Sequence, residues 1–322
     1  PWQLCVAPMM DWTDRHCRYF HRLLAPHARL YTEMITAAAL LHGDSGRLLR
    51  YASAEHPVAL QVAGHEPAEL ARVARMGMDA GYDEINLNVC CPSGRVQAGR
   101  FGAILMLEAG RVADCVRAMR EAVDVPVTVK CRLGVDDQDL EAELEQFVVA
   151  LVDAGVAMLA VHARKAWLKG LSPKQNRTIP PLDHARVHRL KCSFPALPLV
   201  VNGGITDVDT AQGQLECVDG VMIGRAAYHD PWLLARLEAA LYGTALPQRE
   251  QVLVAMQAYL DGQVAAGVAV NQVTRHLLGL FQGEPGARRF RQTLGAGSAR
   301  SHPSAQVLLR ALAVTRAIRP AA

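Results

Sequence analysis

The sequence predicts an α/β protein, a (β/α)8 TIM barrel followed by a small C-terminal all-helical domain. Eight apolar runs rich in β-branched residues recur through the first three quarters of the 322 residues. The segments between these runs carry helical periodicity, and beyond residue 248 only helical patterns remain. Strands that alternate with helices favour a parallel sheet, and eight of them favour a closed barrel over a doubly wound open sheet, which is the alternative.

The apolar runs and the periodic segments define the expected elements of the barrel. Strands are expected over Leu4–Met9, Leu30–Ile35, Val58–Ala63, Glu84–Val89, Val125–Leu133, Met158–Ala163, Leu197–Asn202 and Val218–Ile223. Helices are expected between them, among others over Ala68–Ala80, Arg111–Ala122, Asp139–Ala154 and Asp207–Gln214. The strand spacing is uneven, so the sequence defines the existence of these elements better than their ends.

Turn-forming residues interrupt the alternating pattern at residues 242–248 and predict a domain boundary. We expect a barrel over residues 1–243 and a helical domain over residues 249–322. In the second part, amphipathic patterns separated by glycines and Pro285 predict helices over Arg249–Ala265, Asn271–Phe281, Ala287–Leu294 and Ser304–Ile318.

Charge is distributed unevenly along the chain. The whole sequence has 34 lysines and arginines against 31 acidic residues, but residues 249–322 contain nine arginines, no lysine and three acidic residues. An excess of arginine suits a polyanion, because the guanidinium group is a planar, bidentate donor. Solvated helix faces would explain the same charges equally well.

Cysteine usage and hydropathy bear on the compartment. The eight cysteines form no Cys-x-x-Cys pair and show no regular spacing, which argues against a zinc site and a disulfide framework. We therefore expect a reduced, cytoplasmic protein that needs no metal. The sequence has no apolar run of about 18 residues that would predict a membrane helix. Its first residues resemble a core strand rather than a signal peptide, and because Pro1 is not a natural start we expect a short preceding tail.

Polar side chains gather where the predicted strands end, which is the face on which barrel enzymes carry their active sites. In chain order these ends deliver Asp11, Thr32, Glu33, Gln61, Asn86, Asn88, Cys91, Lys130, Arg132, His162 and Arg164. The last two strands end in Asn202-Gly203-Gly204 and Gly224-Arg225, and glycine turns there predict a phosphate cradle for a mononucleotide. The absence of a Gly-x-Gly-x-x-Gly motif after a strand and of a Walker loop argues against a dinucleotide site or a nucleotide triphosphatase.

Three of these side chains suggest chemistry. Lys130 ends an apolar strand, so its amine could form a Schiff base or hold an electron-rich ring. His162 could bind a cofactor or substrate, or be a satisfied core histidine. Cys91 could be a buried structural thiol, a thiolate nucleophile or, with an ordinary pKa of about 8.5, a proton donor. Cys90 should point to the opposite face of the strand, because neighbouring side chains alternate.

With these residues assembled, the sequence resembles the tRNA-dihydrouridine synthases, and among them the tRNA-dihydrouridine(20/20a) synthase branch. The most specific motifs are residues 11–18, residues 86–102 and residues 162–174, of which the last is a long run that no fold demands. The resemblance extends over nearly the whole chain, from Ala7-Pro8-Met9 to the helical tail.

The resemblance implies an FMN enzyme that reduces uridine to 5,6-dihydrouridine in the D-loop of tRNA, with NADPH or NADH as reductant. Hydride would pass from reduced FMN to C6 of the uracil, and Cys91 would protonate C5. The implied FMN-binding residues are Ala7, Pro8, Met9, Gln61, Lys130, His162, Asn202, Gly203, Gly204, Gly224 and Arg225. The implied tRNA-binding residues are Asn88, Lys174 and Arg177, to which the basic tail adds Arg288 and Arg291. By this resemblance residues 1–243 would form the FMN-binding catalytic barrel and residues 249–322 the helical tRNA-binding domain, and we expect a monomer.

The chain departs from the branch pattern Val-Gly-Cys-Pro-Ser-Asp-Arg at Cys90 and Gly94, and Ile104 stands where a second cysteine is common. We expect these changes to alter the rigidity of the loop, and so the rate more than the type of reaction. Three alternatives remain. They are an FMN barrel oxidoreductase that acts on a free small molecule of the dihydroorotate or enoate type, a Schiff-base aldolase that uses Lys130, and an RNA-binding module without activity.

Overall fold

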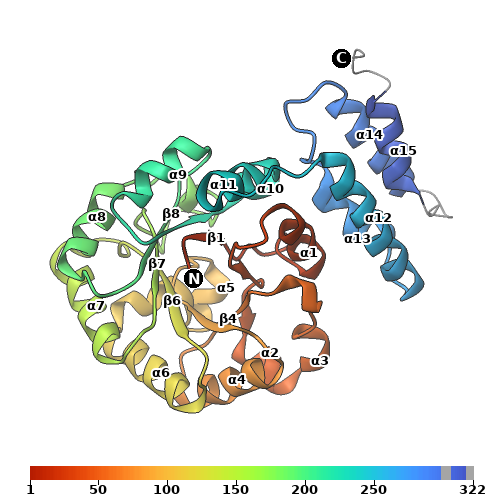
Figure 1. The fold of residues 1–322 in the computed structure, drawn as a ribbon. Coiled ribbons are helices and arrows are strands. Elements are labelled where there is room, and N and C mark those ends of the chain that lie inside the picture. The colour runs from red at the N-terminus through yellow and green to blue at the C-terminus, as the bar shows by residue number, and fades with distance from the viewer. Residues whose placement is uncertain (299–305, 317–322) are drawn as a thin grey trace.

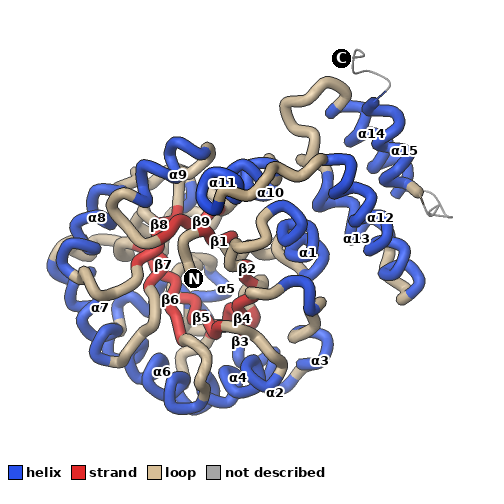
Figure 2. Tube along the Cα trace, in the orientation of Figure 1, coloured by secondary structure: helices blue, strands red, loops and turns tan. Residues whose placement is uncertain are grey.

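The computed structural model describes residues 1–298 and 306–316 of the chain. Its strands form a parallel barrel with helices around the outside, and the C-terminal helices project from one side of it (Figure 1; Figure 2). The strands are hydrogen-bonded in the order β1-β9-β8-β7-β6-β5-β4-β2, and β3 also pairs with β4. A parallel bridge between Cys5 and Arg29 brings the first strand beside the second and closes the ring. The predicted barrel is confirmed.

The strands of the barrel are short. They are β1 (Leu4–Val6), β2 (Leu30–Tyr31), β3 (Ile35–Thr36), β4 (Val58–Ala63), β5 (Glu84–Asn88), β6 (Val127–Arg132), β7 (Leu159–His162), β8 (Leu199–Asn202) and β9 (Gly220–Ile223). Each predicted strand is present. The predicted run Leu30–Ile35 is resolved into β2 and β3, both of which pair with β4.

The helices of the barrel part are α1 (Arg15–Leu24), α2 (Ala37–His42), α3 (Ser45–Leu48), α4 (Pro67–Asp79), α5 (Gly94–Ala98), α6 (Ala109–Ala122), α7 (Ala142–Asp153), α8 (His184–Ser193), α9 (Val208–Leu215), α10 (Arg225–His229) and α11 (Trp232–Tyr242). Short 3-10 helices are η1 (Ser53–Glu55), η2 (Gly102–Leu107) and η3 (Gln175–Arg177). The helical part contains α12 (Arg249–Ala265), α13 (Val270–Thr274), η4 (Arg275–Leu277), α14 (Ala287–Ser298) and α15 (Val307–Arg316).

The predicted helix over Asn271–Phe281 is shorter than expected, because it is divided into α13 and η4. The ends of the predicted helix Ser304–Ile318 lie outside the described residues, and α15 accounts for its centre. No regular element covers residues 243–248, between α11 and α12. The functional division of the chain at this segment stays a prediction.

The two faces of the barrel strands differ in chemistry. Apolar side chains between strands and helices form the main core, while a second cluster inside the barrel is made largely of smaller or sulfur-containing residues, among them Cys5, Ala59, Met158 and Ala160. The strands β5 (Glu-Ile-Asn-Leu-Asn) and β6 (Val-Thr-Val-Lys-Cys-Arg) alternate polar and apolar residues, although every residue in them is buried. One face of each strand therefore supplies polar groups to the barrel interior.

The helical part packs against the start of the barrel. Asp14 caps α1 by accepting hydrogen bonds from the backbone of His16 and Cys17, and its carboxylate also pairs with Arg275 at 2.7 Å and His276 at 3.0 Å. Tyr259 of α12 stacks on Tyr19 of α1, with ring centroids 3.9 Å apart. A partly buried, charged contact thus connects the two parts.

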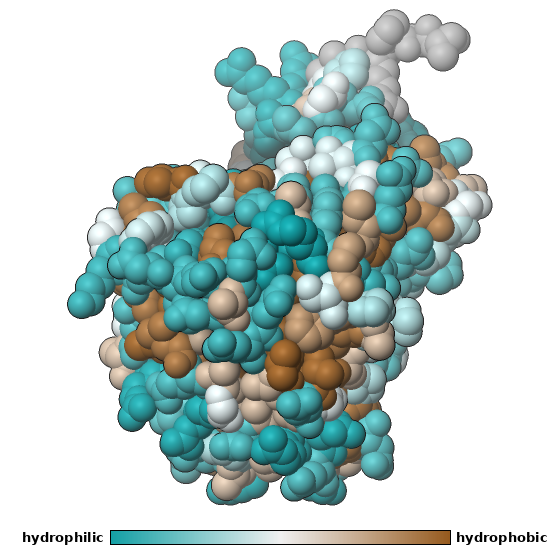
Figure 3. Space-filling model, turned by 90° about the vertical axis from the view of Figure 1, so that its left-hand side faces the viewer, coloured by the Kyte–Doolittle hydropathy of each residue, from teal (hydrophilic) through white to brown (hydrophobic). Residues whose placement is uncertain are grey.

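The outer surface is mainly hydrophilic on the side shown in Figure 3, where hydrophobic residues form separate patches. None of the helices in the described part of the chain combines the length and the apolar character that a membrane-spanning segment needs.

Candidate active site

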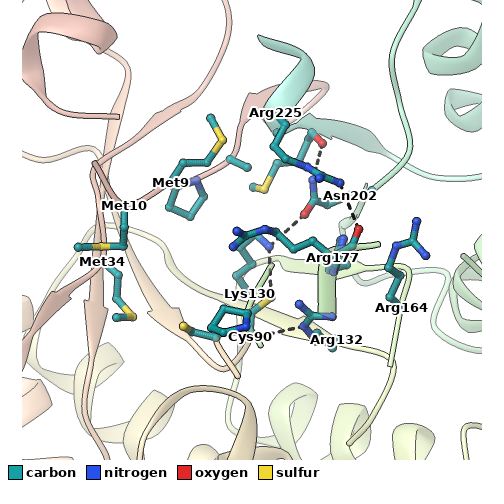
Figure 4. A pocket seen from close by; sticks show the side chains of 18 of the residues that line it. Met9, Met10, Met34, Cys90, Lys130, Arg132, Arg164, Arg177, Asn202 and Arg225 are labelled. Atoms are coloured by element: carbon teal, nitrogen blue, oxygen red, sulfur yellow. Dashed lines mark hydrogen bonds between the residues drawn. The ribbon is translucent and has the colours of Figure 1, made fainter. Parts of the chain in front are cut away.

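A cavity of about 510 Å³ opens at the C-terminal ends of the strands, where side chains from opposite sides of the barrel converge (Figure 4). Every residue predicted to bind FMN lines it: Ala7, Pro8, Met9, Gln61, Lys130, His162, Asn202, Gly203, Gly204, Gly224 and Arg225. Cys91, Asn88 and Arg177 line it too. The structure therefore brings together the predicted catalytic, cofactor and base-contacting side chains.

Three predicted tRNA-binding residues do not line this cavity. Lys174 is exposed and stands next to Pro173, which does line it. Arg288 and Arg291 are exposed on α14, in the helical part. Their contacts with RNA stay a prediction.

Cys90 and Cys91 lie just beyond the end of β5, with Val89 between Asn88 and Cys90. The side-chain oxygen of Asn88 accepts hydrogen bonds of 3.2 Å from both of their backbone amides, which turns the chain out of the strand. The Sγ atom of Cys90 lies 3.5 Å from Nζ of Lys130, inside the cavity. The prediction that Cys90 faces away was wrong, because Cys90 continues the series Glu84, Asn86 and Asn88, whose side chains share the face that supplies the barrel interior.

The loop after Cys91 is anchored at several points, although the acid of the related pattern is replaced by Gly94. The side-chain amide of Gln97 donates to the carbonyl oxygens of Pro92, at 2.9 Å, and Leu168, at 2.8 Å. The amide of Ala103 donates to the carbonyl of Cys91 at 2.9 Å. Gln97 therefore ties this loop to the loop that follows β7.

Lys130 is buried with uncharged or sulfur partners. Besides its contact with Cys90, its amine donates to Oδ1 of Asn202 at 3.1 Å, and Nδ2 of Asn202 donates to the carbonyl of Met222 at 2.7 Å. Burial disfavours a thiolate at Cys90, but the charges and hydrogen bonds of Lys130 and Arg132 lower the pKa of that thiol below its ordinary value.

Four arginines, Arg132, Arg164, Arg177 and Arg225, line the cavity (Figure 4). Within the described residues their hydrogen bonds go to carbonyl oxygens: Arg132 to Cys90, Lys165 and Asn176, Arg164 to Thr178 and Pro180, and Arg225 to Arg177. Burial, followed by the neighbouring Arg225 and Arg132, lowers the pKa of both Arg164 and Arg177. The site has a positive charge that its own carboxylates do not balance, and this favours an anionic ligand.

His162 lies beside the two glycines that end β8. Burial, and then the charges of Arg132 and Lys130, hold the pKa of His162 well below its usual range, so its ring is neutral. Gly203 and Gly204 adopt φ angles of 111° and 74°. A Cβ atom on Gly203 would lie 2.9 Å from the His162 ring, so the close approach of chain and ring requires glycine.

Comparison with known proteins decides the family. The family model described as dihydrouridine synthase (Dus) matches residues 5–318. This chain belongs to the dihydrouridine synthase family. The chain is 58% identical over 298 residues to the tRNA-dihydrouridine(20/20a) synthase of Xanthomonas campestris, covering 92% of this chain and 89% of that one. It is 50% identical over 314 residues to the protein of the same name from Vibrio cholerae, covering 97% and 96% of the two chains.

A solved structure supports the fold of this dihydrouridine synthase family member. A mutant of morphinone reductase in complex with tetrahydroNAD aligns with a TM-score of 0.53, covering 77% of this chain and 88% of that chain. The sequence identity is 15%, so the likeness concerns the barrel and no residue roles.

Several cavity residues of this family member were placed at strand ends or in motifs by the sequence but were given no role. Met10, Trp12 and Met34 line the cavity, and Met10 is 55% exposed. Methionines and tryptophans near strands usually belong to a core, so these residue types do not indicate a functional site. Their positions just after the first two strands could have indicated one. Arg132 and Arg164 were noted as strand-end residues without a role, and both line the cavity.

Proposed function

We propose that this protein reduces uridine at positions 20 and 20a of the tRNA D-loop to 5,6-dihydrouridine, with FMN as cofactor and NADPH as reductant. The observation that carries the proposal is the position of Cys91, whose thiol lines a cavity with hydrogen-bond donors for a planar ring and an unbalanced positive charge for a phosphate. The names of the relatives supply the substrate and the positions.

The residues that line the cavity fit a flavin mononucleotide. Pro8 and Met9 offer an apolar surface to one side of a planar ring, and Gln61 and Lys130 offer donors to its polar edge. At the other end, the backbone at Gly203, Gly204 and Gly224 offers N–H groups to a phosphate beside Arg225. A volume of about 510 Å³ lies within the ordinary range for cofactor sites.

A bound flavin would supply the hydride that C6 of the uracil receives, chemistry that no side chain offers. The residues of the chain then have two tasks. Cys91 donates the proton from Sγ to C5, which completes the saturation of the C5–C6 bond, and recovers a proton from solvent. Asn88, fixed through its oxygen to the backbone of Cys90 and Cys91, holds the base beside that thiol.

The substrate base must leave the RNA stack before it can reach Cys91, which costs a few kcal/mol. Arg177 at the cavity and exposed Lys174 beside it are placed to recover part of that energy through phosphate contacts. The arginines of α14 extend this basic surface to the helical part. We assign the protein to the cytoplasm, as a monomer, as part of the same proposal.

The test is to incubate the purified protein with unmodified tRNA and NADPH and to locate dihydrouridine by mass spectrometry of nuclease fragments. We expect a yellow protein and product at positions 20 and 20a, formed only when tRNA and NADPH are both present. A colourless protein without product would refute the proposal. Oxidation of NADPH by a dihydroorotate- or enoate-type compound at a higher rate than with tRNA would favour the small-molecule alternative.

A further inference from the structure

A buried carboxylate lies inside the barrel, away from the candidate active site. Glu84, the first residue of β5, is fully buried and accepts hydrogen bonds from Nε1 of Trp2 at 2.7 Å, the hydroxyl of Tyr31 at 2.8 Å and the hydroxyl of Thr128 at 2.5 Å. Arg29 also lies within 3.5 Å of it. An ionised carboxylate only accepts hydrogen bonds, so the proton of the Thr128 hydroxyl must point at Glu84.

Side-chain amides extend the hydrogen bonding from Thr128 toward the cavity. Nδ2 of Asn86 donates to Oγ1 of Thr128 at 2.8 Å, and Nε2 of Gln61 donates to Oδ1 of Asn86 at 2.8 Å. Nδ2 of Asn88 donates to Oε1 of Gln61 at 2.9 Å. Oδ1 of Asn88 is the atom that accepts from the backbone amide of Cys91. We call Glu84, Thr128, Asn86, Gln61 and Asn88 the barrel relay.

Strand pairing explains why these residues touch. Asn86 is in register with Gln61 of β4 on one side and with Thr128 of β6 on the other. Glu84, Asn86 and Asn88 share one face of β5 because side chains alternate along a strand. The relay therefore follows from the polar residues of three adjacent strands rather than from a loop conformation.

Every hydrogen bond in the barrel relay runs in the same direction. Each donor is on the side of Cys91 and each acceptor is on the side of Glu84. A side-chain amide has one oxygen and one NH2 group, so reversing one amide would leave two oxygens or two NH2 groups facing each other. Hydrogen bonds connected in this way polarise one another. Both ends require this direction, because the carboxylate of Glu84 accepts and the backbone amides of Cys90 and Cys91 can only donate, whereas Thr128 by itself could donate or accept.

We propose that Glu84 is a positioning residue which, through the barrel relay, fixes the amide orientations of Gln61 and Asn88 and holds the backbone amides at Cys90 and Cys91. The inference rests on the proposed function, in which those groups meet the cofactor and the base. It assigns the remaining N–H of Gln61 and of Asn88 to carbonyl oxygens of bound rings. Neither Glu84 nor Thr128 lines the cavity, so both act through the other members.

Amide hydrogen exchange on the protein alone tests the relay without reference to activity. Thr128→Val keeps the shape of the side chain and removes its hydroxyl. The backbone amides of Cys90 and Cys91 should then exchange roughly fivefold faster, as expected if the loss weakens one hydrogen bond. Thr128→Ser should restore the protection. Thr315→Val removes another buried hydroxyl, which bonds the carbonyl of Ala311 in α15, and should leave these amides unchanged.

Glu84→Gln gives a second route to the same result if Thr128→Val does not fold. The new NH2 group can take the place of an acceptor next to Thr128, so the relay would lose the acceptor that completes it at this end, and exchange at Cys90 and Cys91 should again accelerate. Unchanged exchange in whichever of the two variants folds, with thermal unfolding that shows a native protein, would overturn the proposal.

Kinetics with tRNA and NADPH distinguish positioning from a general loss of structure. Thr128→Val should lower kcat about tenfold while the KM for tRNA changes less than about twofold, and Thr128→Ser should recover most of kcat. An equal loss in the serine and valine variants would contradict positioning by the hydroxyl. If the wild-type protein forms no dihydrouridine, the proposed function fails, while the exchange experiment still decides whether the relay exists.

Discussion

The Nζ atom of Lys130 lies 3.5 Å from the Sγ atom of Cys90, and both groups are buried at the inner end of the cavity. This contact exists because the side chain of Cys90 turns toward the cavity. Burial opposes the thiolate, yet Lys130 and Arg132 lower the pKa of Cys90. This chain therefore places a second, acidic thiol beside the residue that should hold the flavin ring.

We expect the Cys90 thiol to titrate at a lower pH than an ordinary thiol. Because its pKa is depressed in the folded protein, the thiolate contribution to stability is present above the ordinary pKa and is lost as pH falls through the depressed value. Thiolate absorbance at 240 nm, measured as the difference between wild type and Cys90→Ser, should rise at a lower pH than for an ordinary thiol. Cys131→Ser is the matched control, because burial raises the pKa of Cys131 and its removal should change nothing in this range.

Replacement of Cys91 should separate binding from turnover. Cys91→Ala removes the proton donor but no hydrogen bond of the loop, since the backbone amide and carbonyl of residue 91 make those bonds. We expect dihydrouridine formation to fall about 10²-fold or more, with tRNA and flavin still bound. Cys90→Ala is the matched control and should retain most of the activity. A Cys91→Ala variant that turns over at the wild-type rate would remove Cys91 from the mechanism.

The ion pairs of Asp14 should stabilise the contact between the barrel and the helical part. Asp14→Asn preserves a good N-cap but leaves Arg275 and His276 without a carboxylate, so we expect a loss of roughly 2 kcal/mol in the free energy of unfolding. Asp44→Asn is the control, since Asp44 caps the exposed helix α3 and pairs only weakly with Arg47, at 4.0 Å. Denaturant titration of both variants measures the difference, and equal losses would argue against the proposed role of Asp14.

Much of the fold and of the site could be predicted because the relevant signals are local. The strand β4 has the predicted bounds, and α12 begins and ends where the periodicity does. Polar residues such as Gln61 and Lys130 at the ends of apolar strands converge in any closed parallel barrel. Their presence in one cavity follows from strand order alone.

The remaining features depend on contacts between distant segments or on which face of a strand a side chain occupies. Cys90 was misplaced because the inner face was assigned to Cys91 alone, whereas alternation from Asn86 and Asn88 places Cys90 on that face. The barrel relay was not predicted, because it requires the register of β4, β5 and β6. The pairing of Asp14 with His276 joins residues far apart in the sequence, and no local pattern indicates it.

Stability should decline as the pH falls below about 6.5, because two buried histidines resist protonation. Burial lowers the pKa of His16 to about 4, and burial together with the charge of His276 lowers that of His21 to about 3. Between pH 6.5 and the depressed pKa values, the unfolded chain therefore binds more protons than the folded protein. The contribution of the two neutral histidines to the free energy of unfolding is fully present above pH 6.5 and is lost as the pH falls toward the pKa values of the folded protein. Each histidine should remove about 2 kcal/mol between pH 6.5 and pH 5. Urea titrations should show a smaller pH slope for His21→Gln and an unchanged slope for His42→Gln, since His42 is exposed.

The exposed arginines of α14 should contribute to tRNA affinity through phosphates. Arg288→Ala and Arg291→Ala together should weaken binding and reduce the slope of log affinity against log salt concentration by about one for each phosphate that is no longer bound. Catalysis on bound tRNA should change little, because neither residue lines the cavity. Filter binding at several salt concentrations measures the slope, with Arg72→Ala on the barrel helix α4 as the control. If the double variant keeps the wild-type slope, Arg288 and Arg291 are solvated and do not bind phosphates. The tRNA would then be bound by Lys174, Arg177 and the rim of the barrel.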